Sequence, residues 1–319
     1  MLARELALLL ADGAAHSGAA LATHFGVTRA AVWKHIEELR EGGLSIDAAA
    51  GQGYRLARPL ELLDAGRVLA ALPASLRQRV GKVAVSWEID STNTAMLRAA
   101  GAGEGDLSVL MAERQTAGRG RRGRTWQSPL GNVYFSLLKR FDGGMAGLSG
   151  LSLAAGVALA QALADVGAGE VGLKWPNDVL VDGAKLAGIL VELGGEFLGP
   201  CHAVIGIGVN LVRPPGELDQ PVADLATNRA ILPSRNEFAA RLIQRLIETL
   251  ERFSAAGFAS VRDEYAALDL LRDRPLRIAD ARGTHEGIGA GVDERGALRV
   301  RHGAELVVYD SAEVSVRAA

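Results

Sequence analysis

Residues 118–126 read Gly-Arg-Gly-Arg-Arg-Gly-Arg-Thr-Trp, and these residue types suit the binding of a small anion. Glycine lets the backbone make left-handed turns and approach a ligand closely, and successive N–H groups in such turns form an anion-binding concavity. Arginine adds a planar, permanently charged fork that matches carboxylate and phosphate groups. We therefore expect this loop to wrap around a small anion and to become ordered when the anion binds. A solvated surface loop or an RNA-binding segment is the alternative, because basic clusters occur in both.

The glycines of residues 118–123 also match the G-x-G-x-x-G spacing of dinucleotide-binding folds, with Asp142 about 20 residues downstream. In those folds a helix begins at the glycines. Here Pro129 and Gly131 follow, and residues 132–140 have the pattern of a strand. We therefore reject a Rossmann fold for this segment.

A second dense motif covers residues 171–178, Val-Gly-Leu-Lys-Trp-Pro-Asn-Asp. Proline cannot donate a ladder hydrogen bond, so we expect a strand to end at Trp175-Pro176. Lys174, Asn177 and Asp178 then lie at a strand end, where ligand-binding residues often gather. The sequence predicts a polar binding site there.

Lys185 follows Asp182-Gly183, a strong turn signal between the apolar runs 179–181 and 186–193. These runs are predicted to pair as a hairpin. From its position alone, Lys185 is better explained as a solvated turn residue than as a ligand-binding one.

The polar cluster Asp-Ser-Thr-Asn at residues 90–93 is predicted to start a helix that runs toward Ala100. The unpaired N–H groups at a helix start attract an anion or a carbonyl oxygen. Helix capping alone explains one of these polar residues but not the whole cluster. A strand over 109–113 is expected to deliver Gln115 and the arginine-rich loop close by.

The whole chain sets further bounds. Its 319 residues suggest two or three domains, and a net charge of −2 gives no global attraction to nucleic acid or membrane. The single Cys201 and an N-terminus without a secretory pattern fit a reducing cytoplasm. Residues 143–164 carry no charge but are rich in Gly, Ala and Ser, so we expect mostly a buried helix in a soluble core and no membrane association.

Residues 1–58 have the pattern helix, helix, turn, helix and two short strands, which predicts a winged helix-turn-helix. Its third helix, capped by Thr28, would enter a DNA major groove with Arg29, Lys34 and His35 facing outward. Six basic residues and six acidic residues give this region a net charge of zero, so a three-helix protein-interaction module is the alternative.

The pattern of the residues after 60 predicts a middle region of helices and strands. From residue 271 onward it predicts a small β-barrel of about SH3 size. Two helices are expected after a long proline-containing loop that has the character of a binding loop or lid. The expected segments are a helix over 60–72, strands over 82–87 and 203–210, the loop 213–233, helices over 237–255 and 258–267, and short strands from 271 onward.

Taken together, these motifs resemble the family of bifunctional biotin protein ligases and biotin operon repressors, over nearly the whole chain. The order and spacing of several independent motifs make the resemblance specific, whereas no single motif would. The segments that carry it are 16–18, 29–31, 51–54, 91–93, 118–126, 174–178, 185–189 and 206–210.

The resemblance implies an α/β (α+β) fold of three domains. These are a winged helix-turn-helix DNA-binding domain at residues 1–60, a central catalytic domain at 61–268 and an SH3-like β-barrel at 269–319. The central domain would have the mixed sheet of the class II synthetase-like biotin/lipoate ligases.

The resemblance also implies a two-step reaction assisted by Mg²⁺. Biotin and ATP form biotinyl-5′-AMP, and the biotinyl group then passes to a lysine of the biotin carboxyl carrier protein of acetyl-CoA carboxylase. A carboxylate must approach a phosphate in the first step, so cationic groups should stabilise the developing charge. The sequence has no P-loop and no Ser-His-Asp or Cys-His signature for a protein nucleophile.

The resemblance assigns site residues, and it reverses the interpretation of Lys185, whose family counterpart contacts biotin. Lys185 and Arg121 would be catalytic. Biotin would be bound by Ser91, Thr92, Asn93, Gln115, Arg119, Gly120, Arg121 and Lys185. ATP and the adenylate would be bound by Arg121, Arg124, Trp126, Lys174, Asn177, Asp178 and Asn210, with Asn177 and Asp178 near the Mg²⁺.

As a repressor, the chain would bind biotin operator DNA through residues 18–37, including Thr28, Arg29, Lys34 and His35. Biotinyl-5′-AMP would be the corepressor and would favour a homodimer. The alternative is a ligand-sensing transcription regulator whose central domain binds its ligand without ligase activity.

Overall fold

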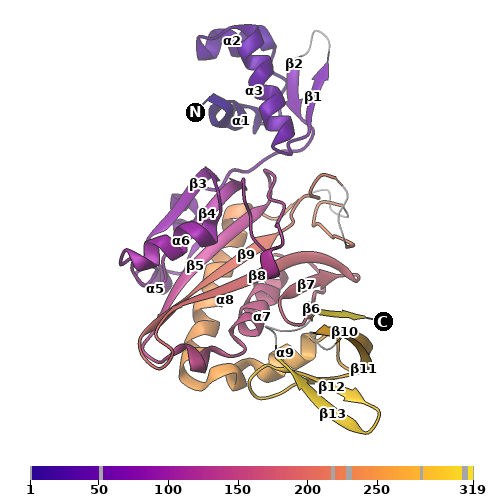
Figure 1. Ribbon diagram of the computed structural model, residues 1–319. Coiled ribbons are helices and arrows are strands. Elements are labelled where there is room, and N and C mark those ends of the chain that lie inside the picture. The colour runs from indigo at the N-terminus through magenta and orange to yellow at the C-terminus, as the bar shows by residue number, and fades with distance from the viewer. Residues whose placement is uncertain are drawn as a thin grey trace.

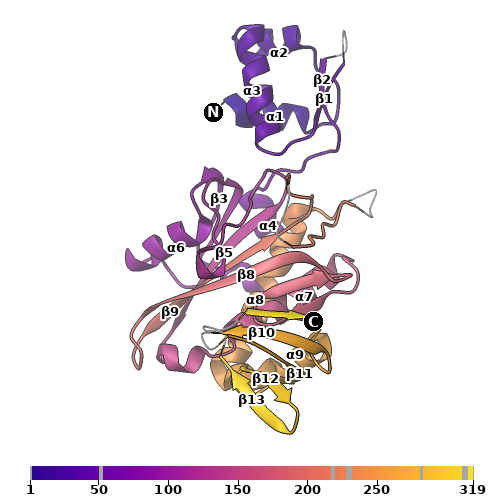
Figure 2. The same ribbon diagram turned by 45° about the vertical axis from the view of Figure 1, so that its right-hand side comes forward.

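A computed structural model of the protein describes residues 2–49, 53–216, 220–227, 232–280, 283–310 and 315–318. Figure 1 shows a small helical part at the N-terminus, a central sheet with helices, and a second sheet at the C-terminal end. Figure 2 shows the C-terminal sheet beside α9, at the end of the molecule opposite the N-terminal helices.

The N-terminal part confirms the predicted winged helix-turn-helix. Ser17 Oγ accepts a hydrogen bond from Ala20 N, and Thr28 Oγ1 accepts one from Ala31 N, so each side chain caps a helix. The predicted turn at Gly51-Gln52 lies outside the described residues. The elements are α1 (Leu2–Leu10), α2 (Gly18–Phe25), α3 (Arg29–Glu41), β1 (Ile46–Ala49) and β2 (Gly53–Leu56).

The central part is built on a mixed seven-stranded sheet of order β3-β4-β5-β9-β8-β7-β6, in which β3 and β4 are parallel and the other neighbours antiparallel. The strands are β3 (Val83–Ile89), β4 (Val109–Gln115), β5 (Val133–Phe141), β6 (Gly172–Lys174), β7 (Asp178–Val181), β8 (Ala184–Gly195) and β9 (Cys201–Val209). The predicted hairpin across Asp182-Gly183 is confirmed.

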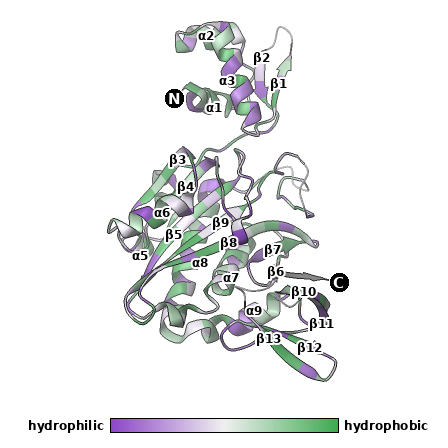
Figure 3. Ribbon diagram, in the orientation of Figure 1, coloured by the Kyte–Doolittle hydropathy of each residue, from purple (hydrophilic) through white to green (hydrophobic). Residues whose placement is uncertain are grey.

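Helices cover both faces of this sheet. Leu137 and Ile205 face a large core with α7 and α8, whereas their neighbours Leu138 and Val204 face α6. Figure 3 shows β5 and β9, between these layers, as mostly hydrophobic. The helices are α4 (Ala65–Ala71), α5 (Ala74–Arg77), α6 (Thr92–Gly101), α7 (Leu151–Asp165), α8 (Arg235–Ala256) and α9 (Arg262–Leu268), with short 3₁₀ turns η1 (Arg121–Gly123), η2 (Met145–Leu148) and η3 (Gly257–Val261).

Three helix starts differ from the predictions. The helix expected over 258–267 is α-helical only from Arg262, after the 3₁₀ turn η3. The helix expected over 60–72 begins only at Ala65, because the Leu63 N–H bonds to the Glu113 carboxylate and Asp64 caps the helix instead. The buried helix expected within 143–164 is α7, which starts at Leu151 and has 15 residues. No helix among the described residues is long and apolar enough to cross a membrane.

The C-terminal part is a five-stranded antiparallel sheet of order β13-β12-β11-β10-β14. Pairing between β13 and β14, which would close a barrel, does not occur in the described part of the chain. The domain boundaries at residues 60 and 268 stay predictions. The strands are β10 (Pro275–Asp280), β11 (Gly283–Val292), β12 (Leu298–His302), β13 (Glu305–Tyr309) and β14 (Ser315–Ala318).

The winged helix rests on the central part through a short loop that follows the arginine-rich segment. The Leu130 N–H donates to the Gly42 carbonyl at the end of α3, at 2.8 Å. Leu130 is buried in the core of the winged helix, where Leu60 of the linker and Trp87 of β3 also pack. The interdomain contact is therefore apolar and tight.

A buried ion pair joins β4 to the start of α8. Glu113 Oε2 lies 2.8 Å from Arg235 Nη1, and the two side chains are 3% and 5% exposed. Glu113 Oε1 also accepts from Leu63 N, and Arg235 donates to the Glu61 carbonyl. The pair thus holds the linker, the sheet and α8 together.

We predict that Glu113→Ala lowers the free energy of unfolding by about 3–5 kcal/mol, because it leaves the Arg235 charge buried without a partner. Urea unfolding measures the change. Glu286→Ala is the matched control, since it removes the exposed Arg277–Glu286 pair and should cost less than about 1 kcal/mol. Equal losses for the two variants would contradict the prediction.

Candidate functional site

The predicted site residues gather on the α6 face of the central sheet. Gly206 and Gly208 of β9 face this side, as Val204 does, because side chains alternate along a strand. A Cβ on Gly206 would lie 2.2 Å from Asn93 Oδ1, and one on Gly208 would lie 2.4 Å from Trp126 Nε1. Glycine is therefore required where the start of α6 and the arginine-rich loop cross the strand.

The start of α6 confirms the predicted polar cluster. Ser91 caps the helix, and both the Thr92 N–H and its hydroxyl donate to Gln115 Oε1, at 2.9 and 3.2 Å. Gln115 Nε2 in turn donates to Ser128 Oγ at 2.9 Å. Ser91, Thr92 and Asn93 are almost completely buried. The structure thus brings together four of the residues predicted to bind biotin.

Asn93 is held by protein groups on both sides of its amide. Its Nδ2 donates to the Leu190 carbonyl and to Glu192 Oε2, and its Oδ1 accepts from Ser136 Oγ at 2.6 Å. Asn93 therefore braces α6 against the sheet.

The arginine-rich loop, residues 118–126, folds into a small hairpin over the sheet. Trp126 N donates to the Gly118 carbonyl, and Gly120 N donates to the Arg124 carbonyl at 2.8 Å. At its tip, Arg122 and Gly123 have positive φ angles of 58° and 72°. Positive φ is costly for arginine, so the tip is the strained part of the loop.

Two contacts fasten the first half of this loop. Arg119 Nη2 lies 2.8 Å from Glu192 Oε1 on β8, and Arg119 Nη1 donates to Thr94 Oγ1 of α6 at 3.3 Å. Neither Glu192 nor Thr94 belongs to a motif that stands out in the sequence. The one available signal was an acidic residue within the otherwise apolar run 186–193.

Trp126 closes the loop against the sheet. Its ring lies over Gly208 and Gly188, the facing glycines of β9 and β8. The Lys185 ammonium is 5.3 Å from the ring centroid, within the range of a cation–π contact. The indole Nε1–H is buried without a hydrogen-bond partner, so a polar ligand group there would find a donor.

Cationic side chains meet the Lys174–Asp178 motif at one end of this face. Lys185 Nζ lies 2.6 Å from Asp178 Oδ1, and Arg121 Nη1 donates to Asn177 Oδ1 at 3.3 Å. Burial, helped by the neighbouring Arg122, lowers the pKa of Arg121. Lys174 pairs with Asp178 across β6 and β7, so the sheet register brings the motif together.

Two further predicted nucleotide-binding residues differ in their surroundings. Asn210 is 2% exposed, and its Nδ2 donates to the Lys185 and Ala223 carbonyls, so it ties the strand end to the following loop. Arg124 is exposed on the arginine-rich loop. Asn210 thus fixes the backbone at Lys185 and at the loop after β9, whereas Arg124 faces solvent.

Asn177 and Asp178 supply the hard oxygen donors that Mg²⁺ prefers, although the Asp178 carboxylate also holds Lys185. Among all the described residues, these two included, no group of three or more His, Cys, Asp or Glu side chains could hold a metal ion. The donor set fits an ion bound by one carboxylate and completed by substrate phosphates, which is the usual arrangement for Mg²⁺.

On the winged helix, α3 presents Arg29 and Lys34 to solvent, together with Trp33, which is 57% exposed. His35 differs, since its Nδ1 lies 2.7 Å from Glu38 Oε2. Thr28 is occupied as the helix cap. An exposed basic and aromatic face on the third helix suits contact with a DNA groove.

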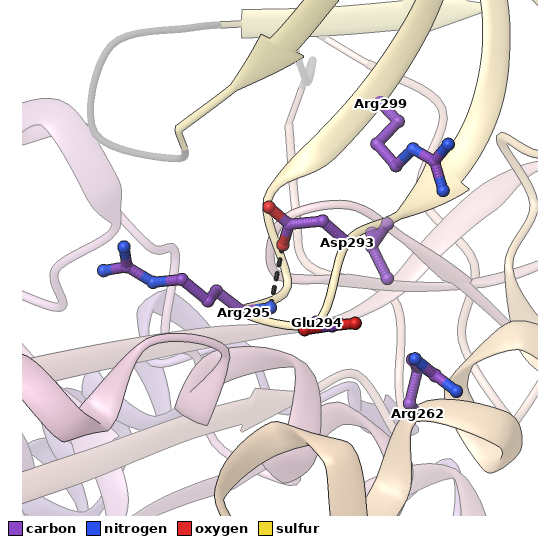
Figure 4. A pocket seen from close by; sticks show the side chains of 6 residues that line it. Arg262, Asp293, Glu294, Arg295 and Arg299 are labelled. Atoms are coloured by element: carbon purple, nitrogen blue, oxygen red, sulfur yellow. Dashed lines mark hydrogen bonds between the residues drawn. The ribbon is translucent and has the colours of Figure 1, made fainter.

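A cavity of about 320 Å³ lies away from all these motifs, between α9 and the β11–β12 turn. Figure 4 shows Arg262 and Arg299 on one side of it and the turn residues Asp293, Glu294 and Arg295 on the other. Basic and acidic side chains both line it, so it has no strong preference for an anion. The face described above is the better candidate.

Comparison with protein families matches two parts of the chain. Residues 87–210 match the biotin/lipoate A/B protein ligase family, and residues 2–55 match a helix-turn-helix domain. The bifunctional ligase/repressor BirA of Salmonella typhimurium is 40% identical over 98% of this chain and 96% of its own length. BirA of Escherichia coli is 38% identical over 99% and 97%.

Among solved structures, the biotin protein ligase of Aquifex aeolicus in complex with biotin and ATP is similar to this chain. Its TM-score is 0.65 at 26% identity, covering 75% of this chain and 99% of that protein. Among sequence relatives, the biotin–[acetyl-CoA-carboxylase] ligase of Paracoccus denitrificans is 36% identical over 70% of this chain and 96% of its own length.

We predict that Gly208→Ala displaces Trp126 and opens the loop, because the new Cβ would overlap the indole ring. Amide exchange over residues 116–125 should become faster, and biotin should bind at least tenfold more weakly, about 1.4 kcal/mol. Gly101→Ala is the control, since a Cβ there meets no atom within 4 Å. Unchanged exchange in Gly208→Ala would show that the loop does not depend on this close approach.

Proposed function

Because this chain belongs to the family of bifunctional biotin protein ligases and repressors, we propose that it activates biotin with ATP and transfers it to a carrier-protein lysine. The observation that carries the proposal is the convergence of Arg121, Lys185 and Asp178 at one end of a buried polar face. The proposed carrier is the biotin carboxyl carrier protein of acetyl-CoA carboxylase. The proposed location is the cytoplasm, which the single cysteine supports.

In the proposed first step, a carboxylate oxygen of biotin attacks the α-phosphorus of ATP, and the bond to pyrophosphate breaks. Both reactants are anions, so Arg121 and Lys185 would lower the barrier by stabilising the charge that develops on the phosphate. Lys185 is well placed for this, because it lies between Asp178 and the Trp126 ring. A bound Mg²⁺ would supply further positive charge at the phosphates.

In the second step, the carrier lysine attacks the acyl carbon of biotinyl-5′-AMP, and AMP leaves. No protein nucleophile is required. The adenylate is reactive, so the enzyme must exclude water and hold it until the carrier arrives. The arginine-rich loop, residues 118–126, with Trp126 lying over the sheet, would provide that cover.

The remaining proposed roles are those that the family resemblance implies. Ser91, Thr92 and Gln115 would hydrogen-bond the biotin ring system, for which their buried network offers paired donors and acceptors. Asn93 and Gly120 would complete the biotin side. Lys174, Asn177, Asp178, Arg124, Trp126 and Asn210 would serve the nucleotide side, with Asn177 and Asp178 nearest the Mg²⁺.

The winged helix adds a second role, transcriptional repression, with the adenylate as corepressor. Its exposed Arg29 and Lys34 support operator binding, and a homodimer would place two such helices on two half-sites. The competing function is a regulator that senses a ligand without catalysis. The cationic cluster at Arg121 and Lys185 favours the ligase, because a pure sensor needs no stabilisation of a developing charge.

We predict biotin-dependent release of pyrophosphate from ATP, measured with the full chain and Mg²⁺. Lys185→Ala should reduce the rate at least a hundredfold, the usual loss when one stabilising donor is removed. Lys82→Ala changes an exposed lysine at the start of β3 and should match wild type. Binding of biotin without any pyrophosphate release would favour the sensor over the ligase.

For the repressor role, we expect the chain to shift DNA from upstream of its host's biotin genes in a gel assay. Biotin and ATP together should tighten binding, because the adenylate favours the dimer. Lys34→Ala should weaken binding while leaving pyrophosphate release unchanged. Absence of any shift, with and without the ligands, would remove the repressor role and leave the ligase intact.

A further inference from the structure

We propose that Glu192 is a positioning residue for the ligase reaction: its carboxylate holds the Arg119 guanidinium and so anchors the arginine-rich loop, residues 118–126, over the sheet. The proposal rests on the ligase function proposed above. It gives Arg119 a different task from Arg121, although the two arginines are neighbours in the same loop.

The geometry engages both oxygens of the Glu192 carboxylate. Oε1 lies 2.8 Å from Arg119 Nη2, and Oε2 accepts from Asn93 Nδ2 at 3.0 Å. The Glu192 side chain is only 21% exposed and shares its face of β8 with Gly188, on which Trp126 lies. A single carboxylate therefore links the loop to the start of α6.

The negative charge of Glu192 requires an explanation, because the proposed substrate, biotin, also carries a carboxylate. An unpaired negative charge beside it would weaken biotin binding by like-charge repulsion. Arg119 neutralises Glu192, and Thr94 accepts a further hydrogen bond from Arg119. The Arg119 guanidinium is thus used to fasten the loop between α6 and β8.

The loop is consequently fastened unevenly. Its first half has the Arg119 anchor, and its end has the Trp126 ring on the sheet. The tip between them contains the positive φ angles of Arg122 and Gly123, and Arg121 in this tip donates to Asn177 at 3.3 Å. By holding Arg119, Glu192 would fix the first half of the loop. Arg121 could then move toward the substrate carboxylate or phosphate while that half stays in place.

The test variant is Glu192→Gln, which keeps the size of the side chain and an acceptor for Asn93 but removes the charge. The Arg119 side chain is 48% exposed, so solvent screens the pair. We expect the KM for biotin to rise about three- to fivefold, with kcat changed less than about twofold. Amide exchange over 116–125 should become faster in the ligand-free protein, with no change in Tm. Glu192→Asp, which keeps the charge, should lie between Gln and wild type.

The matched control is Glu88→Gln, which alters the exposed Arg114–Glu88 pair, of similar length at 3.0 Å, on β3 and β4. It should leave the KM and the loop exchange at wild-type values. If Glu192 acts through Arg119, adding Glu192→Gln to Arg119→Ala should cause no further loss. A merely structural role would instead give additive losses and a lower Tm.

Wild-type KM and wild-type loop exchange in Glu192→Gln would overturn the proposal, as would additive losses in the double variant. The exchange measurement requires no turnover. If the wild-type chain released no pyrophosphate, the ligase function would fail, and loop exchange in Glu192→Gln would still decide whether Glu192 anchors the loop.

Discussion

The close approach of side chains to the backbone of β8 and β9 is the constraint on which the rest of the site depends. Gly188, Gly206 and Gly208 leave one face of the central sheet without side chains where Trp126 and Asn93 must lie. Any Cβ there would push α6 or the arginine-rich loop outward. The opposite face of the same strands is fully apolar and packs on α7 and α8. One strand pair thus borders the core on one side and the proposed ligand site on the other.

Much of the fold could be predicted because its signals are local. Ser17 and Thr28 cap helices within three residues of their partners, and Asp182-Gly183 makes its turn in place. The long uncharged segment 143–164 was correctly assigned to a buried helix, but its start at Leu151 was not, since Gly150 and the preceding 3₁₀ turn set it. Likewise, Glu113 takes the Leu63 N–H from a distant strand and delays the helix after the linker.

The candidate site was predictable as a set of motifs and not as a geometry. The dense motifs stood out by composition, and the sheet does bring them to one face. The partners that fix them are isolated residues with no local pattern, such as Glu192 for Arg119 and Ser128 for Gln115. The closure of the C-terminal sheet could not be read from its turns, because it depends on pairing between the two outermost strands.

The contact of Leu130 with the end of α3 has a consequence for modularity. Leu130, Leu60 and Trp87 belong to the central part and its linker, yet they complete the core of the winged helix. The segment from Trp126 to Leu130 is five residues long, and Ser128 bonds both Gln115 and the Trp126 carbonyl. The winged helix is therefore held against the central part by direct packing and a backbone hydrogen bond, in addition to the linker. Replacing the winged helix by another domain would therefore also require changes at Leu130 and in the segment that leads back to Trp126.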